Sequence, residues 1–378
     1  MTTKSSASIV ALAGDPGGAN ALAPVLEALS ESGRPLCILA YRQALTLWRE
    51  RGLNPQEVPE SDPVAALATA LSKAGLLLTA TSVNGVDLER HATALAKTMG
   101  VPSLALLDFW SNYRLRFAQD NGSLILPDAI AVMDAQAVSE MIAEGFPEDR
   151  LRIMGQPVFD DLATRRASFD DARRQELRRV FGLGLEDRLI LYVSQPFTEL
   201  YGSAGNAKQH LGFSEGEVLA SCQDGLEHLS RKHDLQIVLA IRPHPREVRK
   251  NFSSFQVGHF RAAIWECPDR VDAILAADLV LGMNSVLLLE AVLLRQWVVS
   301  VQPRLRIADP LPCNRDGRSL AVYETDMIES ALEKALFDLN WRQQQSLNLQ
   351  AGLPEAGATE RVVLFAEETL KSGAKNLE

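Results

Sequence analysis

The stretch Ala277–Val301 reads ADLVLGMNSVLLLEAVLLRQWVVSV and contains three apolar runs separated by short polar turns. Leu279–Gly282 and Trp297–Val301 have the length of buried strands, and Val286–Leu294 has the length of a helix. A buried strand, a polar turn and a helix in this order predict one βα unit of a parallel sheet. The backbone N–H groups at the start of such a helix, with the Ser285 hydroxyl, can bind a phosphate.

Glu290 is the one acid inside this apolar helix segment. A buried carboxylate needs a partner, and the hydroxyl groups of a ribose would serve. The alternative is that Asn284 or Ser285 is a plain N-cap and that Glu290 is exposed. The leucines around Glu290 leave little room for an exposed face, so we predict nucleotide binding at Asn284, Ser285 and Glu290.

The same alternation of apolar strands and amphipathic helices runs through most of the chain. The expected strands are Ser8–Ala13, Leu36–Ala40, Leu76–Ala80, Pro102–Leu107, Ala129–Met133, Leu151–Met154, Arg188–Val193, Gln236–Ile241, Leu279–Gly282 and Trp297–Val301. The expected helices are Ala19–Ser32, Leu45–Arg51, Val64–Lys73, Leu88–Met99, Ala135–Glu144, Val218–Lys232, Val271–Ala276, Val286–Leu294, Asp326–Leu339 and Ala358–Leu370. Near-continuous apolar strands in this rhythm predict parallel sheets that are covered by helices on both faces.

The length of 378 residues suggests two domains, at roughly 150 residues per domain. The rhythm stops at Gly155-Gln156-Pro157 and restarts at Arg188. We therefore expect an α/β protein with two Rossmann-like, doubly wound parallel-sheet domains. The first covers residues 1–160 and is completed by a C-terminal helix at 357–378, residues 161–187 form a linker and a basic helix, and the second domain covers residues 188–356. Within that linker, Thr164–Val180 carries six arginines and three acids and is interpreted as an exposed, solvated face.

Composition excludes several classes of protein. A formal net charge of −10 argues against a nucleic-acid binder, which would usually be basic. Four widely spaced cysteines without a CxxC pair indicate reduced thiols rather than a zinc cluster or a disulfide framework. The apolar run Ile9–Ala13 is too short for a signal peptide, and no run of about 18 apolar residues predicts a membrane span. We therefore expect a cytoplasmic protein without a transmembrane segment.

Ligands of doubly wound sheets bind at the carboxyl ends of the strands, so the loops that follow the strands form the candidate site. The first such loop, Gly14–Asn20, has the sequence GDPGGAN and opens a helix. Its glycines would let a ligand approach the backbone closely, and we assign Gly17, Gly18 and Asn20 to substrate binding. An ordinary tight turn is an equally good interpretation of this loop.

The loop after the fourth expected strand, Leu107–Arg116, reads LDFWSNYRLR. Asp108 is a candidate catalytic base or an acceptor for sugar hydroxyl groups. The neighbouring polar and aromatic residues are assigned to substrate binding, namely Trp110, Asn112, Tyr113 and Arg116. The alternative is that Trp110 and Tyr113 pack in a core while the arginines are solvated.

In the second domain, three further loops carry polar residues at strand ends. Ser194 and Gln195 follow Val193, and Arg242-Pro243-His244-Pro245-Arg246 follows Ile241. Prolines on both sides restrict the backbone of His244, which we assign to catalysis because an imidazole there can donate to a phosphate or sugar oxygen. Ser194, Arg242, Arg246 and Arg304 are assigned to the nucleotide phosphates, and Gln195 to the substrate. No second histidine or cysteine has ligand spacing, so no metal site is expected.

Taken together, these residues resemble the GT-B superfamily of nucleotide-sugar enzymes, above all UDP-N-acetylglucosamine 2-epimerases and bacterial polysaccharide glycosyltransferases. Five segments carry the resemblance: Gly14–Asn20, GQPVFDDL at Gly155–Leu162, RPHP at Arg242–Pro245, Ala277–Val301 and GATER at Gly357–Arg361. The resemblance implies two domains that face a central cleft. It also implies that the nucleotide binds mainly to the C-terminal domain and that the sugar chemistry takes place in the cleft.

The chain departs from the epimerases at three loops. Their N-terminal loop contains arginine and glutamate, whereas the loop here begins Gly14-Asp15-Pro16. Their histidine–glutamate–alanine–glycine segment is replaced by Leu107-Asp108-Phe109-Trp110, and their glycine–histidine–arginine loop by Ser194-Gln195-Pro196. Because those loops carry much of the family's elimination chemistry, the departures count against epimerase activity more than against nucleotide-sugar binding.

The resulting hypothesis is a glycosyltransferase that uses a nucleotide-sugar donor, expected to be a UDP-sugar, in glycan or glycoconjugate biosynthesis. Asp108 would act as general base on an acceptor hydroxyl, and His244, Ser285 and the arginines would stabilise the leaving diphosphate. This design needs no cofactor and no metal. Two alternatives stay open: a UDP-N-acetylhexosamine 2-epimerase, hydrolysing or non-hydrolysing, and a non-catalytic nucleotide-sugar-binding homologue.

The expected partners follow from this hypothesis. They are a nucleotide-sugar and a glycan or lipid-linked acceptor, and no nucleic acid. Peripheral membrane contact through the arginines of 165–179, and a homodimer, are both left open.

Overall fold

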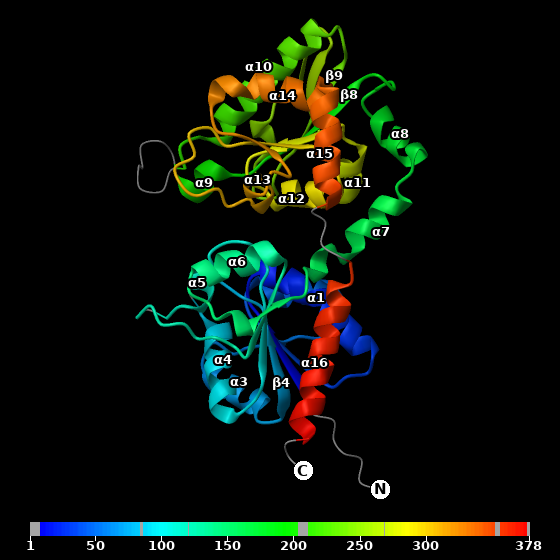
Figure 1. Ribbon diagram of the computed structural model, residues 1–378. Helices are drawn as coiled ribbons and strands as arrows, with labels where there is room; N and C mark the ends of the chain where they lie inside the picture. The colour runs from blue at the N-terminus through cyan, green and yellow to red at the C-terminus, as the bar shows by residue number, and fades with distance from the viewer. Residues whose placement is uncertain are drawn as a thin grey trace. The chain divides into compact units, whose positions relative to one another are not determined.

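The structure, a computed structural model, describes residues 8–83, 86–119, 121–202, 211–267, 269–351 and 356–375. The chain forms two compact units. Unit 1 comprises Met1–Asp160 and Pro354–Glu378, and unit 2 comprises Asp161–Leu353. Each unit is a twisted sheet with helices on both faces (Figure 1).

The sheet of unit 1 has seven parallel strands in the order β3-β2-β1-β4-β5-β6-β7. The strands are β1 (Ser8–Ala13), β2 (Leu36–Ala40), β3 (Gln56–Glu57), β4 (Ala74–Thr79), β5 (Ser103–Leu106), β6 (Ala129–Val132) and β7 (Leu151–Ile153). The order reverses between β1 and β4, which is the topological switch point of a doubly wound sheet.

The helices of unit 1 are α1 (Pro16–Glu31), α2 (Gln43–Glu50), α3 (Pro63–Leu71), α4 (Leu88–Met99), α5 (Tyr113–Phe117), α6 (Ala135–Ala143) and α16 (Ala358–Lys375), with the 3₁₀ turns η1 (Glu148–Arg150) and η2 (Pro157–Phe159). The last helix, α16, lies beside α1 although more than 300 residues separate them (Figure 1). Its Val362 and Ala366 are fully buried in the same core as Leu22 and Leu26 of α1. Asp160 accepts hydrogen bonds from the first backbone N–H groups of α16, at 2.7–3.1 Å, and so anchors its start to unit 1.

The sheet of unit 2 has the order β10-β11-β9-β8-β12-β13-β14 and is parallel except for the edge strand β10. The strands are β8 (Arg188–Val193), β9 (Ile237–Arg242), β10 (Phe255–Val257), β11 (Phe260–Ile264), β12 (Leu279–Gly282), β13 (Val298–Val301) and β14 (Leu320–Val322). Without β10, the other six strands repeat the order β3-β2-β1-β4-β5-β6 of unit 1, so the switch point lies between β8 and β12. The expectation of two Rossmann-like parallel-sheet domains is confirmed.

The helices of unit 2 are α7 (Asp160–Ser168, whose first residue belongs to unit 1), α8 (Asp171–Arg179), α9 (Phe197–Tyr201), α10 (Glu215–Lys232), α11 (Arg270–Ala276), α12 (Val286–Leu293), α13 (Pro312–Arg315), α14 (Ile328–Phe337) and α15 (Leu339–Ala351), with η3 (Arg249–Asn251) and η4 (Thr325–Met327). The single helix expected over Asp326–Leu339 ends at Phe337 instead. Asp338 has extended backbone and accepts a hydrogen bond from the Trp341 N–H at 3.0 Å, which starts α15 as a separate helix.

The arginine-rich stretch is largely exposed, as expected, but several of its arginines pair with acids of unit 2. Arg174 and Arg178 of α8 both pair with Asp278, at 2.5 and 2.7 Å, and Arg173 pairs with Asp272 at 2.7 Å. The Arg178 side chain is only 4% exposed. These ion pairs dock α8 against α11 and the start of β12, so the stretch belongs to unit 2.

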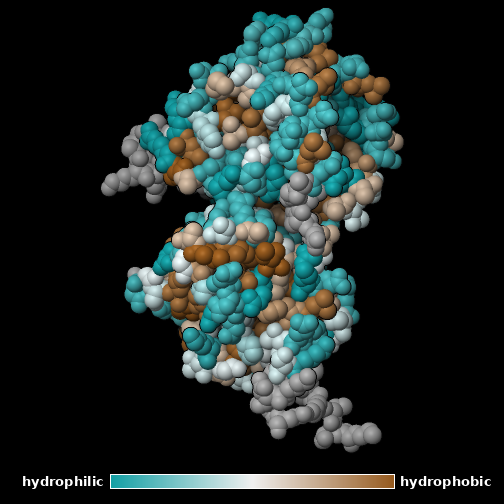
Figure 2. Space-filling model, in the orientation of Figure 1, coloured by the Kyte–Doolittle hydropathy of each residue, from teal (hydrophilic) through white to brown (hydrophobic). Residues whose placement is uncertain are grey.

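Figure 2 shows hydrophilic side chains over much of the visible face of each unit, with hydrophobic side chains in smaller groups. Among the residues that the structure describes, no helix combines the length and the apolar composition that crossing a bilayer requires.

Candidate functional site

The polar loops of unit 2 meet at the carboxyl ends of β8 and β12, on either side of the switch point. The Gln195 side-chain amide donates to Asn284 Oδ1 at 3.1 Å, and the Asn284 backbone N–H donates to Gln195 Oε1 at 3.0 Å. This reciprocal pair joins the loop after β8 to the loop after β12. Ser285 is the N-cap of α12, and its hydroxyl oxygen accepts from the Leu287 N–H at 3.3 Å. The structure therefore brings together Gln195, Asn284 and Ser285 as the strand order requires.

Glu247 joins the loop after β9 to the loop after β8, and the sequence analysis did not assign it a role. Its Oε1 accepts from the Ser194 hydroxyl at 2.8 Å, and its Oε2 accepts from the His244 backbone N–H at 2.7 Å. The Nδ1 atom of His244 accepts from the Arg246 N–H at 3.2 Å. In the neutral imidazole the proton must then be on Nε2, which leaves this atom as a hydrogen-bond donor.

His244 and Arg242 line a pocket of about 460 Å³ at the ends of β9 and β11. Trp265 and Cys267 also line the pocket, and Arg242 donates to the Cys267 carbonyl at 2.6 Å. The lining therefore combines cationic side chains and an indole with the carboxylates of Glu247 and Glu266. Arg246 is exposed, and its role in phosphate binding stays a prediction.

Glu290 is 5% exposed, so the sequence expectation of a buried acid is confirmed. Its Oε2 accepts from Arg270 Nε at 2.7 Å, whereas its Oε1 makes no hydrogen bond with any described residue. Burial raises the pKa of the Glu290 carboxyl, and the nearby charges of Arg270 and Arg242 partly offset this rise. Glu290 is thus held by one oxygen and can accept from a ligand with the other.

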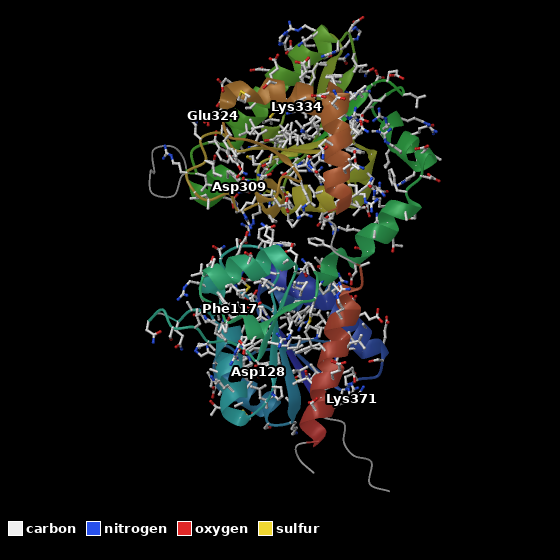
Figure 3. All side chains as sticks on the ribbon, viewed as in Figure 1. Phe117, Asp128, Asp309, Glu324, Lys334 and Lys371 are labelled. Atoms are coloured by element: carbon white, nitrogen blue, oxygen red, sulfur yellow. The ribbon has the colours of Figure 1, made fainter. Side chains whose placement is uncertain are left out.

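Arg304 follows β13 and is exposed, with a 3.5 Å contact to Glu217. The loop that carries it is held by Asp309, which is labelled in Figure 3. The Asp309 carboxylate accepts from Gln302, Asn314 and Tyr323 at 2.7–2.9 Å. Side-chain hydrogen bonds to Asp309 therefore fix the conformation of the loop after β13. Phosphate contact by Arg304 stays a prediction.

In unit 1, the glycine loop is packed so closely that side chains would not fit. A Cβ atom on Gly17 would lie 2.2 Å from Asp108 Oδ2, and one on Gly18 would lie 2.4 Å from the Cβ of Ala80. On Gly14 it would lie 2.1 Å from the Tyr41 ring. The backbone of the α1 start therefore lies directly against the loops after β2, β4 and β5.

Asp108 lies at the carboxyl end of β5 and is held by its neighbours. It forms a short ion pair with Arg116, accepts from the Thr81 hydroxyl at 3.1 Å, and keeps 13% of its side chain exposed. The Gln156 side-chain amide donates to the Asp108 backbone carbonyl at 2.9 Å. Arg116 is 6% exposed, so its guanidinium is not solvated. The guanidinium also donates to the Ser111 carbonyl and to the Thr81 hydroxyl.

Glu89 lies on α4, the helix that follows β4, and the sequence analysis did not single it out. It is 5% exposed and accepts from the Gly14 N–H at 3.0 Å and from the Ser82 and Tyr41 hydroxyls at 2.6 Å each. Burial raises the pKa of this carboxyl despite these hydrogen bonds. A signal was available, because Glu89 shares the helical spacing of the apolar residues Ala92 and Ala96.

Both aromatic residues assigned to substrate binding, Trp110 and Tyr113, lie in the interior of unit 1. Trp110 is 4% exposed and donates to Asp134 at 2.9 Å, and Tyr113 is 2% exposed and donates to Glu140 at 2.6 Å. Trp110 and Tyr113 therefore pack in the core, as the alternative interpretation of this loop stated. Asn20 is half-buried in α1 and Asn112 is exposed, and their binding roles stay predictions.

The described residues contain no group of three or more histidine, cysteine, aspartate or glutamate side chains that could hold a metal ion. The four cysteines are free thiols, and three of them are buried.

Comparison with known proteins rests on structure alone, because no protein-family model and no curated protein matches the chain. The UDP-GlcNAc 2-epimerase from Neisseria meningitidis, solved with UDP-GlcNAc, superposes with a TM-score of 0.60 at 14% identity, over 96% of this chain and 100% of that one. Anabaena HepE, solved with UDP and glucose, gives 0.60 at 13% identity, over 97% and 99%. The wall teichoic acid polymerase TagF gives 0.55 at 14%, over 98% and 90%.

The chain has the GT-B fold. The likeness extends over nearly the whole chain, so the resemblance stated from the five sequence segments is confirmed at the level of the fold. Proteins of one fold perform different reactions, so the function of this chain depends on the chemistry of its site.

Proposed function

We propose that the protein is a glycosyltransferase that uses a nucleotide-sugar donor, with a UDP-sugar as the expected donor. The observation that carries this proposal is Glu290, a buried carboxylate at the switch-point edge of unit 2 that has one oxygen on Arg270 and the other without a described partner. Such an acceptor beside a phosphate-binding helix start suits the vicinal hydroxyl groups of a ribose.

The donor diphosphate would lie against the start of α12 and the loop after β9. Backbone N–H groups at the start of α12, the guanidinium of Arg242 and the Nε2–H of His244 can all donate to phosphate oxygens. These groups are held in place before the reaction by Glu247 and by the pair of Gln195 and Asn284. Fixed donors of this kind stabilise charge that develops on a leaving diphosphate.

Asp108 is the proposed base of unit 1. An acceptor hydroxyl would attack the anomeric carbon of the donor sugar and give its proton to Asp108, while the bond from that carbon to the phosphate oxygen breaks and the nucleoside diphosphate leaves. Arg116, Thr81 and Gln156 position Asp108 for this role. A glycan or a lipid-linked glycan is the proposed acceptor, which places the protein in glycan or glycoconjugate biosynthesis.

A UDP-N-acetylhexosamine 2-epimerase is the second candidate, and the names of several structural neighbours favour it. Against it stand the three loops in which the chain departs from the epimerases. Those loops here read Gly14-Asp15-Pro16, Leu107-Asp108-Phe109-Trp110 and Ser194-Gln195-Pro196. Asp15 and Asp108 are their only titratable side chains, so they offer fewer groups for proton abstraction and return. A non-catalytic nucleotide-sugar-binding protein is the third candidate.

Incubation with UDP-N-acetylglucosamine separates the candidates. The transferase proposal predicts that the sugar stays intact until an acceptor glycan is added, and that Asp108→Asn then slows transfer without weakening UDP binding. Proton NMR detects both the epimer and free UDP. If either forms without an acceptor, the transferase proposal is refuted and the second candidate is supported. If the protein binds the nucleotide-sugar but converts it with none of the acceptors tested, the non-catalytic binding protein is supported.

A further inference from the structure

A cluster of three N–H-bearing side chains lies at the amino edge of the unit 2 sheet, away from the strand ends described above. Arg188 is the first residue of β8, and Trp297 directly precedes β13. Arg342 comes from α15, and its guanidinium carbon lies 3.7 Å above the centroid of the Trp297 ring. The strand β8 has six residues, so this cluster and the loop after β8 are about 17 Å apart along the strand.

Both arginines reach the last turn of α14. Arg342 donates through Nη1 to the Leu336 carbonyl at 3.1 Å, and the Arg188 guanidinium lies 5.9 Å from the centroid of the Phe337 ring. The helix end and the aromatic rings explain why two cations are tolerated here. Their charges remain close to each other, because the charge of Arg188 contributes to lowering the pKa of Arg342.

Three donors of this cluster have no acceptor within the described part of the chain. They are the Nε atoms of Arg188 and Arg342 and the indole Nε1 of Trp297, all of which are buried. An unpaired buried donor is costly, and native structures contain few of them. Three in one place, on two neighbouring cations and an indole, indicate that an acceptor from outside the chain completes the cluster.

The neighbouring acid does not supply that acceptor. Asp278 precedes β12 and its oxygens accept from Arg174, Arg178 and the Leu189 N–H, at 2.5–2.8 Å. Neither Arg188 nor Arg342 forms an ion pair with a described residue. The Asp278 carboxylate is therefore already paired with Arg174 and Arg178.

We propose that Arg188, Trp297 and Arg342 form a second anion site, which binds a phosphoryl group at the amino edge of the unit 2 sheet. All the available groups are donors, and a tetrahedral oxyanion offers an acceptor oxygen to each of them. The site is distinct from the proposed donor-nucleotide site, so it stands or falls independently of the proposed function. Its ligand is either inorganic phosphate or the phosphate of a small monoester.

The indole N–H of Trp297 is a direct reporter. The chain has five tryptophans, so the ¹H–¹⁵N spectrum has few indole cross-peaks, and Trp297→Phe assigns the relevant one while keeping an aromatic ring under Arg342. Phosphate and glycerol 3-phosphate are titrated separately into the full chain, at constant ionic strength set with chloride. We expect at least one of them to shift the Trp297 cross-peak saturably, and the tighter ligand identifies the source of the phosphoryl group.

Matched variants test the assignment. Arg342→Gln should weaken the ligand about tenfold or more, because it removes a charged donor. Arg231→Gln removes the same charge from an exposed position of unit 2 and should leave the affinity unchanged. Glu290→Gln should also leave it unchanged. The proposal is overturned if neither ligand moves the Trp297 cross-peak, or if the folded Arg342→Gln protein binds as tightly as the wild type.

Discussion

Glu89 provides the sharpest test of how the glycine loop is held. Its carboxylate accepts three hydrogen bonds inside unit 1, from the Gly14 N–H and from the hydroxyls of Ser82 and Tyr41. Replacement by alanine removes the acceptor of all three donors and leaves space in the core. Replacement by glutamine keeps the shape and one acceptor oxygen, while its amide can donate to the Tyr41 hydroxyl.

The two replacements should differ strongly in stability. A buried donor left without an acceptor costs about 1–3 kcal/mol, so Glu89→Ala should lower the free energy of unfolding by at least about 3 kcal/mol. Glu89→Gln should cost far less, because only the role of one hydroxyl must change. The loss in the alanine variant should also lower turnover, since Gly14 begins the loop against which Asp108 packs.

The pH dependence of Glu89→Gln gives a second and independent signal. Burial raises the pKa of Glu89 in the folded protein above its ordinary value of about 4.3, so in this window the folded state binds more protons than the unfolded chain. The wild type therefore loses stability as pH rises from the ordinary value to the raised one. The glutamine variant has no such group, and its stability relative to the wild type should increase over the same pH window.

Urea unfolding of the three proteins at a series of pH values between 4 and 8 measures both effects. If Glu89→Ala unfolds at the same urea concentration as the wild type, the three hydrogen bonds do not hold the loop. If the difference in unfolding free energy between Glu89→Gln and the wild type does not change with pH, burial does not raise the pKa of the Glu89 carboxyl.

Two further predictions concern packing in the two units. Gly17→Ala should slow sugar transfer at least tenfold at saturating donor, because the new Cβ would lie 2.2 Å from Asp108 Oδ2. Gly216 lies in α10 with open space around it. Gly216→Ala should therefore leave the free energy of unfolding unchanged or raise it by up to about 1 kcal/mol. If Gly17→Ala transfers sugar at the wild-type rate, the reaction does not depend on the position of Asp108. Asp278→Asn should lower stability by about 3 kcal/mol in thermal or urea unfolding because it leaves buried guanidinium groups unpaired, whereas removal of the half-exposed Arg173 should cost about 1 kcal/mol or less. Equal effects of these last two would contradict the docking of α8 by buried ion pairs.

Much of the fold could be predicted because its central strands are short apolar runs. The residue bounds of β1, β2, β8 and β12 agree with the sequence prediction, and so do those of α4, where Gly100 ends the helix. The interior strand β11 (Phe260–Ile264) was missed, and so were the edge strands β3, β10 and β14. The three edge strands have two or three residues, and β3 and β10 expose all of their side chains, so these edge strands lack the pattern by which a buried strand is recognised.

The candidate site could be predicted in part. Glu290 and Ser285 were found because an acid and a small polar residue interrupt an apolar segment, which is a local signal. Glu247 was missed because its role depends on Ser194, which is 53 residues away and meets it only through the strand order. The docking of α8 was missed for the same reason, since Asp278 lies 100 residues beyond Arg178.

The central claim is that a nucleoside diphosphate binds at the switch-point edge of unit 2, with its ribose on Glu290. Isothermal titration of UDP, GDP, CMP and dTDP into the full chain tests it directly, with Glu290→Gln as the variant and the partly exposed Glu329→Gln as its control. We expect one nucleotide, UDP, to bind with one molecule per chain, and Glu290→Gln to weaken this binding about tenfold while Glu329→Gln does not. No binding by any of the four nucleotides, or equal binding by both variants, would contradict it.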